Sequence, residues 1–61
     1  MKYREFTRLL RENGWRLKNQ EGSHQQWVHL AKPGKVTVAG HQNDDIPPGT
    51  LKAMLKQAGL K

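Results

Sequence analysis

The chain has 61 residues, with eleven Lys and Arg against five Asp and Glu, a formal net charge of +6 and no cysteine. This length leaves room for one domain, residues 1–61, and the lack of cysteine excludes disulfides and thiolate metal clusters. The sequence has no apolar run long enough for a membrane span and no signal-peptide pattern, so we expect a soluble, cytoplasmic protein without membrane contact. Its positive charge favours a polyanion or an acidic protein as partner.

The first predicted element is an amphipathic helix over about residues 2–13. Apolar residues recur there at helical spacing, charged residues fill the other face, and Gly14 follows as a typical helix stop. The apolar face consists of Tyr3, Phe6, Leu9 and Leu10. From Trp15 the period changes to two, because apolar and basic residues alternate from there to Lys18, which predicts a strand.

Two further strands are predicted after this one. The polar segment 19–23 contains glycine and is expected to turn the chain. A second strand is expected from about His24 to Leu30, residues 32–34 (Lys-Pro-Gly) form a tight turn, and a third strand covers residues 35–39. Short connections between three strands imply an antiparallel meander.

The last part of the chain is predicted to be a loop followed by a helix. Residues 40–47 form the loop, and the helix begins either with Thr50 as its N-cap or one turn earlier at Pro48. Its expected core face is Leu51, Met54, Leu55 and Ala58. The order α-β-β-β-α predicts an α+β two-layer sandwich, with both helices on one face of a three-stranded antiparallel sheet, an arrangement that resembles the double-stranded-RNA-binding fold.

Strand parity predicts which way the side chains of the second strand point. If Trp27 points toward the helices, His29 does too, and His24 faces outward. If Val28 points inward instead, an unbroken strand turns His24 toward the helices. The aromatic ring is the larger apolar group to bury, so we expect the first arrangement, with His29 as a structural histidine.

Three features together closely resemble the HicA family of toxins. They are the triplet Gly22-Ser23-His24, the three-strand meander and the closing segment of residues 49–60. The likeness covers nearly the whole chain, beginning at Phe6. It implies an mRNA-cleaving endoribonuclease, the toxin of a type II toxin–antitoxin pair. It also implies inhibition by a HicB-type antitoxin, and contact with DNA only through that antitoxin.

The resemblance places the family's catalytic histidine on His24. Many relatives resemble Val-Pro-x-His after the third strand, whereas this chain has Val38-Ala39-Gly40-His41. The proline is missing, so we carry no function onto His41.

The chemistry of RNA cleavage fits a histidine beside cations. RNA is cut without a metal or other cofactor when its own 2′-hydroxyl attacks the adjacent phosphorus, and the enzyme then has only to move protons and offset charge. Imidazole exchanges protons near neutral pH, and general acid–base catalysis typically contributes roughly 10²–10⁴-fold. We therefore assign His24 as general base or general acid, without choosing between the two.

Candidate RNA-binding residues surround this histidine in the sequence. Gly22 and Ser23 offer backbone N–H and hydroxyl groups to a phosphate. Basic side chains that could follow the RNA backbone are Arg16, Lys18, Lys32, Lys35, Lys52 and Lys56. Lys18 is the strongest of these candidates because its strand leads directly into the His24 turn.

A metal site is disfavoured by the same sequence. His24 and His29 have opposite parity in the strand, and Asp44 and Asp45 have no third carboxylate nearby in sequence. We expect these two aspartates to lie in a solvated loop, near the positive end of the second helix dipole.

Two other functions remain open at this point. The first is a non-catalytic double-stranded-RNA-binding module, which the order of elements supports although no lysine-rich block opens the second helix. The second is a regulatory subunit such as a DNA-binding repressor component, which two helices separated by a meander do not favour. Trp15 and Trp27 could stack RNA bases but are expected in the core.

Overall fold

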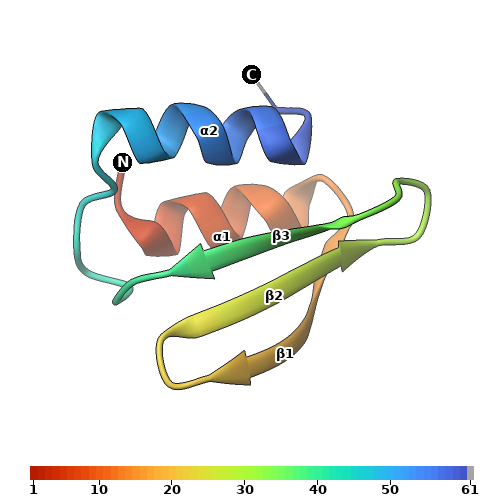
Figure 1. Ribbon diagram of the computed structural model, residues 1–61, viewed down its shortest axis with the longest axis horizontal. Helices are drawn as coiled ribbons and strands as arrows, with labels where there is room; N and C mark the ends of the chain where they lie inside the picture. Colours follow the sequence, from red (N-terminus) through yellow and green to blue (C-terminus); the bar gives the residue numbers. More distant parts are fainter. Residues whose placement is uncertain (61) are drawn as a thin grey trace.

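Within the described residues, 1–60, the computed structural model contains α1 (Tyr3–Glu12), β1 (Trp15–Glu21), β2 (His24–His29), β3 (Lys35–Ala39) and α2 (Pro48–Ala58) (Figure 1). The strands pair antiparallel in the order β1-β2-β3, which confirms the predicted α+β meander. Residue 61, the last of the predicted domain, lies outside the described residues.

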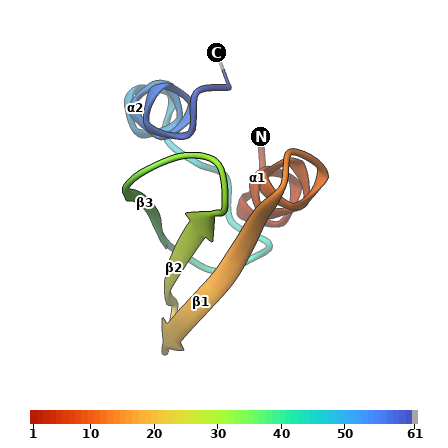
Figure 2. The ribbon, with the colours of Figure 1, turned by 90° about the vertical axis from the view of Figure 1, so that its right-hand side faces the viewer.

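Both helices pack on one face of the sheet, as predicted, and the opposite face is open (Figure 2). α2 lies against β3, and α1 contacts β1. The sheet contributes Trp27, Val36 and Val38 to the core, each nearly or fully buried. Neither helix in residues 1–60 is long and apolar enough to cross a membrane.

The predicted parity of β2 is confirmed. Trp27 is fully buried, whereas His24 is exposed and Val28 is only half-buried. The guanidinium of Arg11 on α1 lies 5.1 Å from the centre of the Trp27 ring and covers it from the helix side. The tryptophan therefore determines which face of β2 is buried, and the histidine takes the other face.

The connection between β1 and β2 is shorter than the predicted turn at residues 19–23. β1 continues to Glu21, and the turn consists of Gly22 and Ser23 alone. Gly22 has φ +58°, as the first central residue of a type II′ hairpin turn requires. The polar residues 19–21 belong to the strand because pairing with β2 outweighs their weak strand propensity.

The ends of the other elements differ from the prediction by a residue or two. β2 stops at His29, and Leu30 beyond it is 91% exposed. α2 begins at Pro48, so the earlier of the two predicted starts is confirmed, and Pro48 needs no backbone N–H in the first turn. Gly59 ends the helix at φ +71°, the left-handed conformation that glycine adopts without strain.

The loop at residues 40–47 packs against the start of α1. The backbone N–H groups of Tyr3 and Arg4 donate to the carbonyls of Asp44 and Gln42 at 3.1 Å, and Ile46 N–H donates to the Met1 carbonyl at 2.9 Å. The bonds from Tyr3 and Arg4 satisfy N–H groups that the first turn of a helix leaves without intrahelical partners.

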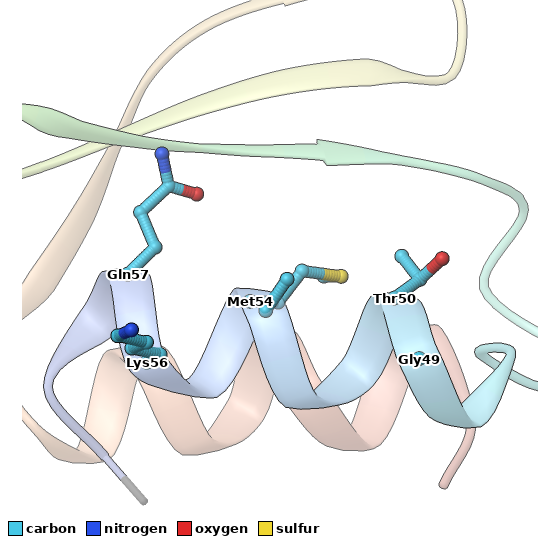
Figure 3. A pocket seen from close by; sticks show the side chains of 6 residues that line it. Gly49, Thr50, Met54, Lys56 and Gln57 are labelled. Carbon is cyan, nitrogen blue, oxygen red and sulfur yellow. The ribbon is translucent and has the colours of Figure 1, made fainter.

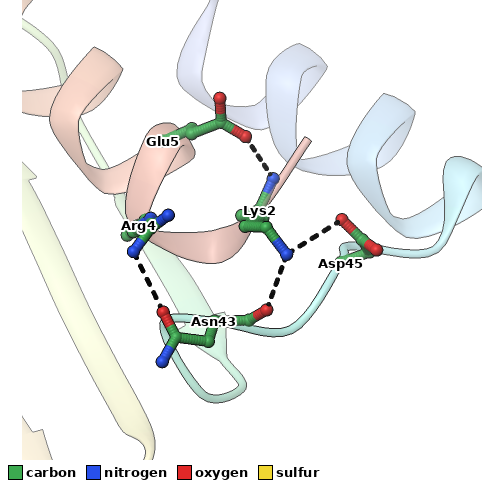
Figure 4. Close-up of polar contacts among 5 residues, drawn as sticks. All are labelled: Lys2, Arg4, Glu5, Asn43 and Asp45. Atoms are coloured by element: carbon green, nitrogen blue, oxygen red, sulfur yellow. Dashed lines mark hydrogen bonds and ion pairs between the residues drawn. The ribbon is translucent and has the colours of Figure 1, made fainter.

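Side chains reinforce the same contact (Figure 4). Lys2 Nζ donates to the Asn43 carbonyl at 3.0 Å and lies 4.0 Å from the Asp45 carboxylate, and Arg4 donates to Asn43 Oδ1 at 3.1 Å. Asp45 lies in the exposed loop just before α2, as predicted, and in addition forms an ion pair with Lys2 at α1. The loop folds back on the N-terminus of the chain, which local sequence does not reveal.

One glycine of this loop is required by close packing. A Cβ on Gly40 would lie 2.4 Å from the ring of Tyr3, far inside contact distance. Gly40 N–H also donates to the Ser23 carbonyl at 3.2 Å. The exit from β3 is therefore held between the β1–β2 turn on one side and α1 on the other.

Candidate functional site

His24 stands at the first position of β2, directly after the Gly22-Ser23 turn. Its side chain is exposed and lies on the open face of the sheet, opposite to the helices. Within residues 1–60 the ring makes no hydrogen bond or ion pair. The imidazole is therefore accessible to a bound substrate and available for proton transfer.

Glu21 lies directly opposite His24 across the hairpin, and both side chains belong to the open face. A carboxylate beside an imidazole is a common means of orienting the ring for proton transfer. No ion pair joins these two side chains among the described residues. The polar segment 19–23 suggests a longer turn that contains Glu21, so the sequence pattern hides this residue. A two-residue loop at Gly22-Ser23 is what pairs it with His24.

Arg16 and Lys35 lie in one row across the open face, on either side of Val28. Both pair with Val28, Arg16 from β1 and Lys35 from β3, and both are exposed. Val28 is four residues after His24 on β2, so this row lies about 13 Å from the histidine at a rise of about 3.3 Å per residue. The structure thus brings two of the predicted cations together at a fixed distance from the candidate catalytic ring.

The residues that pair across the sheet between these two rows are polar but uncharged. Asn19 pairs with Gln26, and Gln26 pairs with Thr37 on the other side. Their amide and hydroxyl groups can donate hydrogen bonds to phosphate or ribose oxygens. Along the open face, His24 and Glu21 lie at one end, the neutral donors lie in the middle, and Arg16 and Lys35 lie at the other end.

Lys18 has no register partner, because the pairing shifts between Leu17 and Asn19. This bulge interrupts the alternation of residues 15–18, which in a regular strand would place Lys18 on the same face as Arg16. Lys18 is exposed and lies on the strand that leads to the His24 turn, but its face is not fixed by pairing.

The remaining basic candidates are not brought to this face. Lys52 and Lys56 belong to α2, which covers the other side of the sheet. Lys32 Nζ lies 3.4 Å from the Ala58 carbonyl at the end of α2. The cations that share a face with His24 by register are therefore Arg16 and Lys35.

Gly22 and Ser23 also line a polar hollow of about 340 Å³ on the opposite side of the hairpin tip from His24. The other lining residues are Gln20, Gln25, Gly40, His41 and Gln42. No sequence pattern reveals this hollow, since it forms only where the hairpin tip meets the loop after β3.

His29 and the two tryptophans are structural, as predicted. His29 Nε2 lies 2.9 Å from the Asn13 carbonyl, its Nδ1 accepts from Ala31 N–H at 2.9 Å, and its ring packs edge-on against Trp15. Trp15 and Trp27 are 3% and 0% exposed. Neither tryptophan can stack on an RNA base without unfolding part of the core.

Two further features of the surface bear on possible ligands. A larger, mostly apolar hollow of about 810 Å³ runs along α2, where Thr50, Met54 and Gln57 point toward β3 (Figure 3). Across residues 1–60, no three His, Asp or Glu side chains are grouped closely enough to hold a metal ion.

Comparison with known proteins identifies the family. A sequence model described as "HicA toxin of bacterial toxin-antitoxin" matches residues 3–60, nearly the whole chain. The chain belongs to the HicA toxin family. A HicA relative from Pseudomonas fluorescens (strain Pf0-1), named "Probable mRNA interferase HicA", is 37% identical over 62 residues, which cover 100% of this chain and 98% of the relative. The resemblance seen in Gly22-Ser23-His24 and the closing helix is thereby confirmed.

Proposed function

We propose that this chain is the toxin of a type II toxin–antitoxin pair and acts as an endoribonuclease on mRNA. Membership of the HicA family supports the toxin role, and the name of the Pseudomonas fluorescens relative supports the activity. The observation that carries the proposal is the exposed ring of His24 on the open sheet face, with Arg16 and Lys35 on the same face. An accessible proton carrier and fixed cations are what RNA cleavage requires.

The proposed reaction uses the substrate's own nucleophile. The 2′-hydroxyl loses its proton and attacks the adjacent phosphorus, and the bond to the 5′-oxygen breaks as that oxygen gains a proton. The products are a 2′,3′-cyclic phosphate and a 5′-hydroxyl. His24 carries one of these two protons, as base or as acid, and the reaction needs no metal or other cofactor.

The cations act on binding rather than on bond cleavage. The backbone positions of Arg16 and Lys35 lie in a row about 13 Å from His24 along β2, at about 3.3 Å per residue. They are suited to hold phosphates further along the strand. Gly22 and Ser23, next to His24, are proposed to contact the reacting nucleotide. Lys18 is proposed as an additional contact to the RNA phosphate backbone.

The test of this function is RNA cleavage in the presence of a chelator. Purified protein is expected to shorten a labelled single-stranded RNA in excess EDTA and to leave 2′,3′-cyclic phosphate ends, detected by mass spectrometry. The second candidate, a double-stranded-RNA-binding module, is favoured by the α-β-β-β-α order. A shift of duplex RNA on a gel with no shortening of single-stranded RNA would favour that candidate and contradict the enzyme.

The inhibitor is proposed to be a HicB-type protein that covers the open face with an acidic surface. The net charge of +6 and the exposed Arg16 and Lys35 support an acidic partner, and DNA contact would then come only through the antitoxin. Binding of the antitoxin is expected to protect His24 from modification by diethyl pyrocarbonate, measured by mass spectrometry. Equal modification in the free and bound toxin would contradict occlusion of this residue.

A further inference from the structure

The polar hollow at the hairpin tip lies on the side of the sheet opposite to His24. Gln20 and Gln25 are register partners, and Gln25 shares its face with the buried Trp27. The loop after β3 completes the hollow with His41 and Gln42. Its volume of about 340 Å³ is at the small end of the range typical of ligand pockets, which suits a group of the size of one nucleobase.

Hydrogen bonds fix which side-chain amide atom of each facing glutamine remains free. Gln20 Nε2 donates to the Gly22 carbonyl at 3.0 Å, and Gln25 Oε1 accepts from Trp27 Nε1 at 3.2 Å. A carbonyl only accepts and an indole N–H only donates, so neither amide can be flipped without losing its bond. Within residues 1–60, Gln20 Oε1 therefore remains as a free acceptor and Gln25 Nε2 as a free donor.

This pairing of an acceptor with a donor matches the edge of a nucleobase. Each RNA base carries a donor and an acceptor side by side on its Watson–Crick edge, and proteins read such edges in unpaired bases while stacking the base on a ring such as histidine. His41 supplies a ring at the hollow. None of the seven lining residues is Lys or Arg, so the hollow offers no lysine or arginine charge to a phosphate.

The hollow also has the right position relative to the proposed catalytic residue. Ser23 lines it, and His24 follows Ser23 directly in the chain with its side chain on the opposite face. The Gly40 N–H bond to the Ser23 carbonyl holds the two walls of the hollow together. RNA that crosses the hairpin tip can therefore place one nucleotide at His24 and the base of a neighbouring nucleotide in the hollow.

We propose that this hollow binds one unpaired nucleobase of the RNA next to the cleaved linkage, with Gln20 and Gln25 as the residues that determine specificity. This inference rests on the proposed ribonuclease function. A well-formed pair of hydrogen bonds to a base edge discriminates between bases by roughly 5- to 150-fold. Cleavage should accordingly depend on the identity of that one nucleotide.

The decisive variant is Gln25→Glu. The new carboxylate still accepts the bond from buried Trp27 Nε1, but it replaces the free donor with an acceptor. We expect the rank order of cleavage rates to change by at least about 5-fold among single-stranded RNAs that differ only at the nucleotide beside the cut. Gln57→Glu on α2 makes the same charge change away from the hairpin and should leave the order unchanged.

A binding measurement separates this inference from the cleavage reaction itself. A 2′-O-methyl trinucleotide, which lacks the attacking hydroxyl, is titrated into the protein and followed by NMR. We expect the NMR signals of the Gln25 side-chain NH₂ and of the His41 ring to shift during the titration. These shifts should be absent with a matched trinucleotide whose bases are removed.

Three results then have distinct meanings. Base-dependent shifts without any cleavage by the wild-type protein would support the hollow and overturn the ribonuclease function. Cleavage by the wild type with an unchanged base preference in folded Gln25→Glu would overturn the hollow and retain the function. Equal shifts with the base-free ligand would also overturn the hollow, because phosphate contacts alone would then explain binding.

Discussion

Replacing His24 with alanine is expected to lower the rate of RNA cleavage by roughly 10²–10⁴-fold, the usual contribution of a general acid or base. The ring is exposed and makes no hydrogen bond within residues 1–60, so its removal should leave the fold intact. The measurements are initial cleavage rates on single-stranded RNA in EDTA and inhibition of growth on expression. Circular dichroism at the same temperature checks that the variant is folded.

His29→Gln is the matched control for this experiment. It removes another histidine from β2, but on the face that packs toward α1, where the ring bonds to Asn13 and Ala31. We expect a lower melting temperature with cleavage per folded molecule close to that of the wild type. A folded, nuclease-free preparation of His24→Ala that cleaves at the wild-type rate would rule out the catalytic assignment.

The second large effect is expected from removing the cation pair of the open face. In the double variant Arg16→Ala/Lys35→Ala, the net charge falls from +6 by two, to +4. Each phosphate contact on single-stranded RNA contributes about 0.7 to the slope of log affinity against log salt, so two contacts contribute about 1.4. Binding at 0.1 M salt should weaken by roughly 25-fold, and the difference should disappear toward 1 M salt.

Lys52→Ala/Lys56→Ala is the control for net charge. It also leaves +4, but the two lysines lie on α2, on the covered side of the sheet. Fluorescence anisotropy of a labelled, 2′-O-methyl single-stranded RNA over a range of salt concentrations measures both slopes. If the two double variants weaken binding equally, the effect is one of overall charge, and the assignment of the phosphate path to the open face is wrong.

Much of the fold follows from local patterns in the chain. The change of period at Trp15 marks the end of the helix and the beginning of the strands, because side chains repeat every 3.6 residues in one and every two in the other. The size of Trp27 determines which face of β2 is buried, and therefore that His24 is exposed. These features depend on residues close in sequence, so they can be read without coordinates.

The details of the site depend on contacts between distant segments. Glu21 faces His24, and Arg16 joins Lys35, only because the hairpin turn has two residues and the pairing shifts at Lys18. Propensity predicts a longer turn there, since Asn, Gln and Glu are poor strand residues in isolation. Cross-strand hydrogen bonds outweigh that preference, and they are a property of the folded sheet.

The sequence by itself determined the order of elements, the outward direction of His24 and the resemblance to the HicA family. Only the tertiary structure decided which cations share the histidine's face and that Gln20 and Gln25 meet His41 around one hollow. The physical reason is that register and loop docking join residues that are far apart in the sequence, such as Arg16 with Lys35 and Gln20 with His41. A shift of one residue in that register would reverse every side chain of the strand.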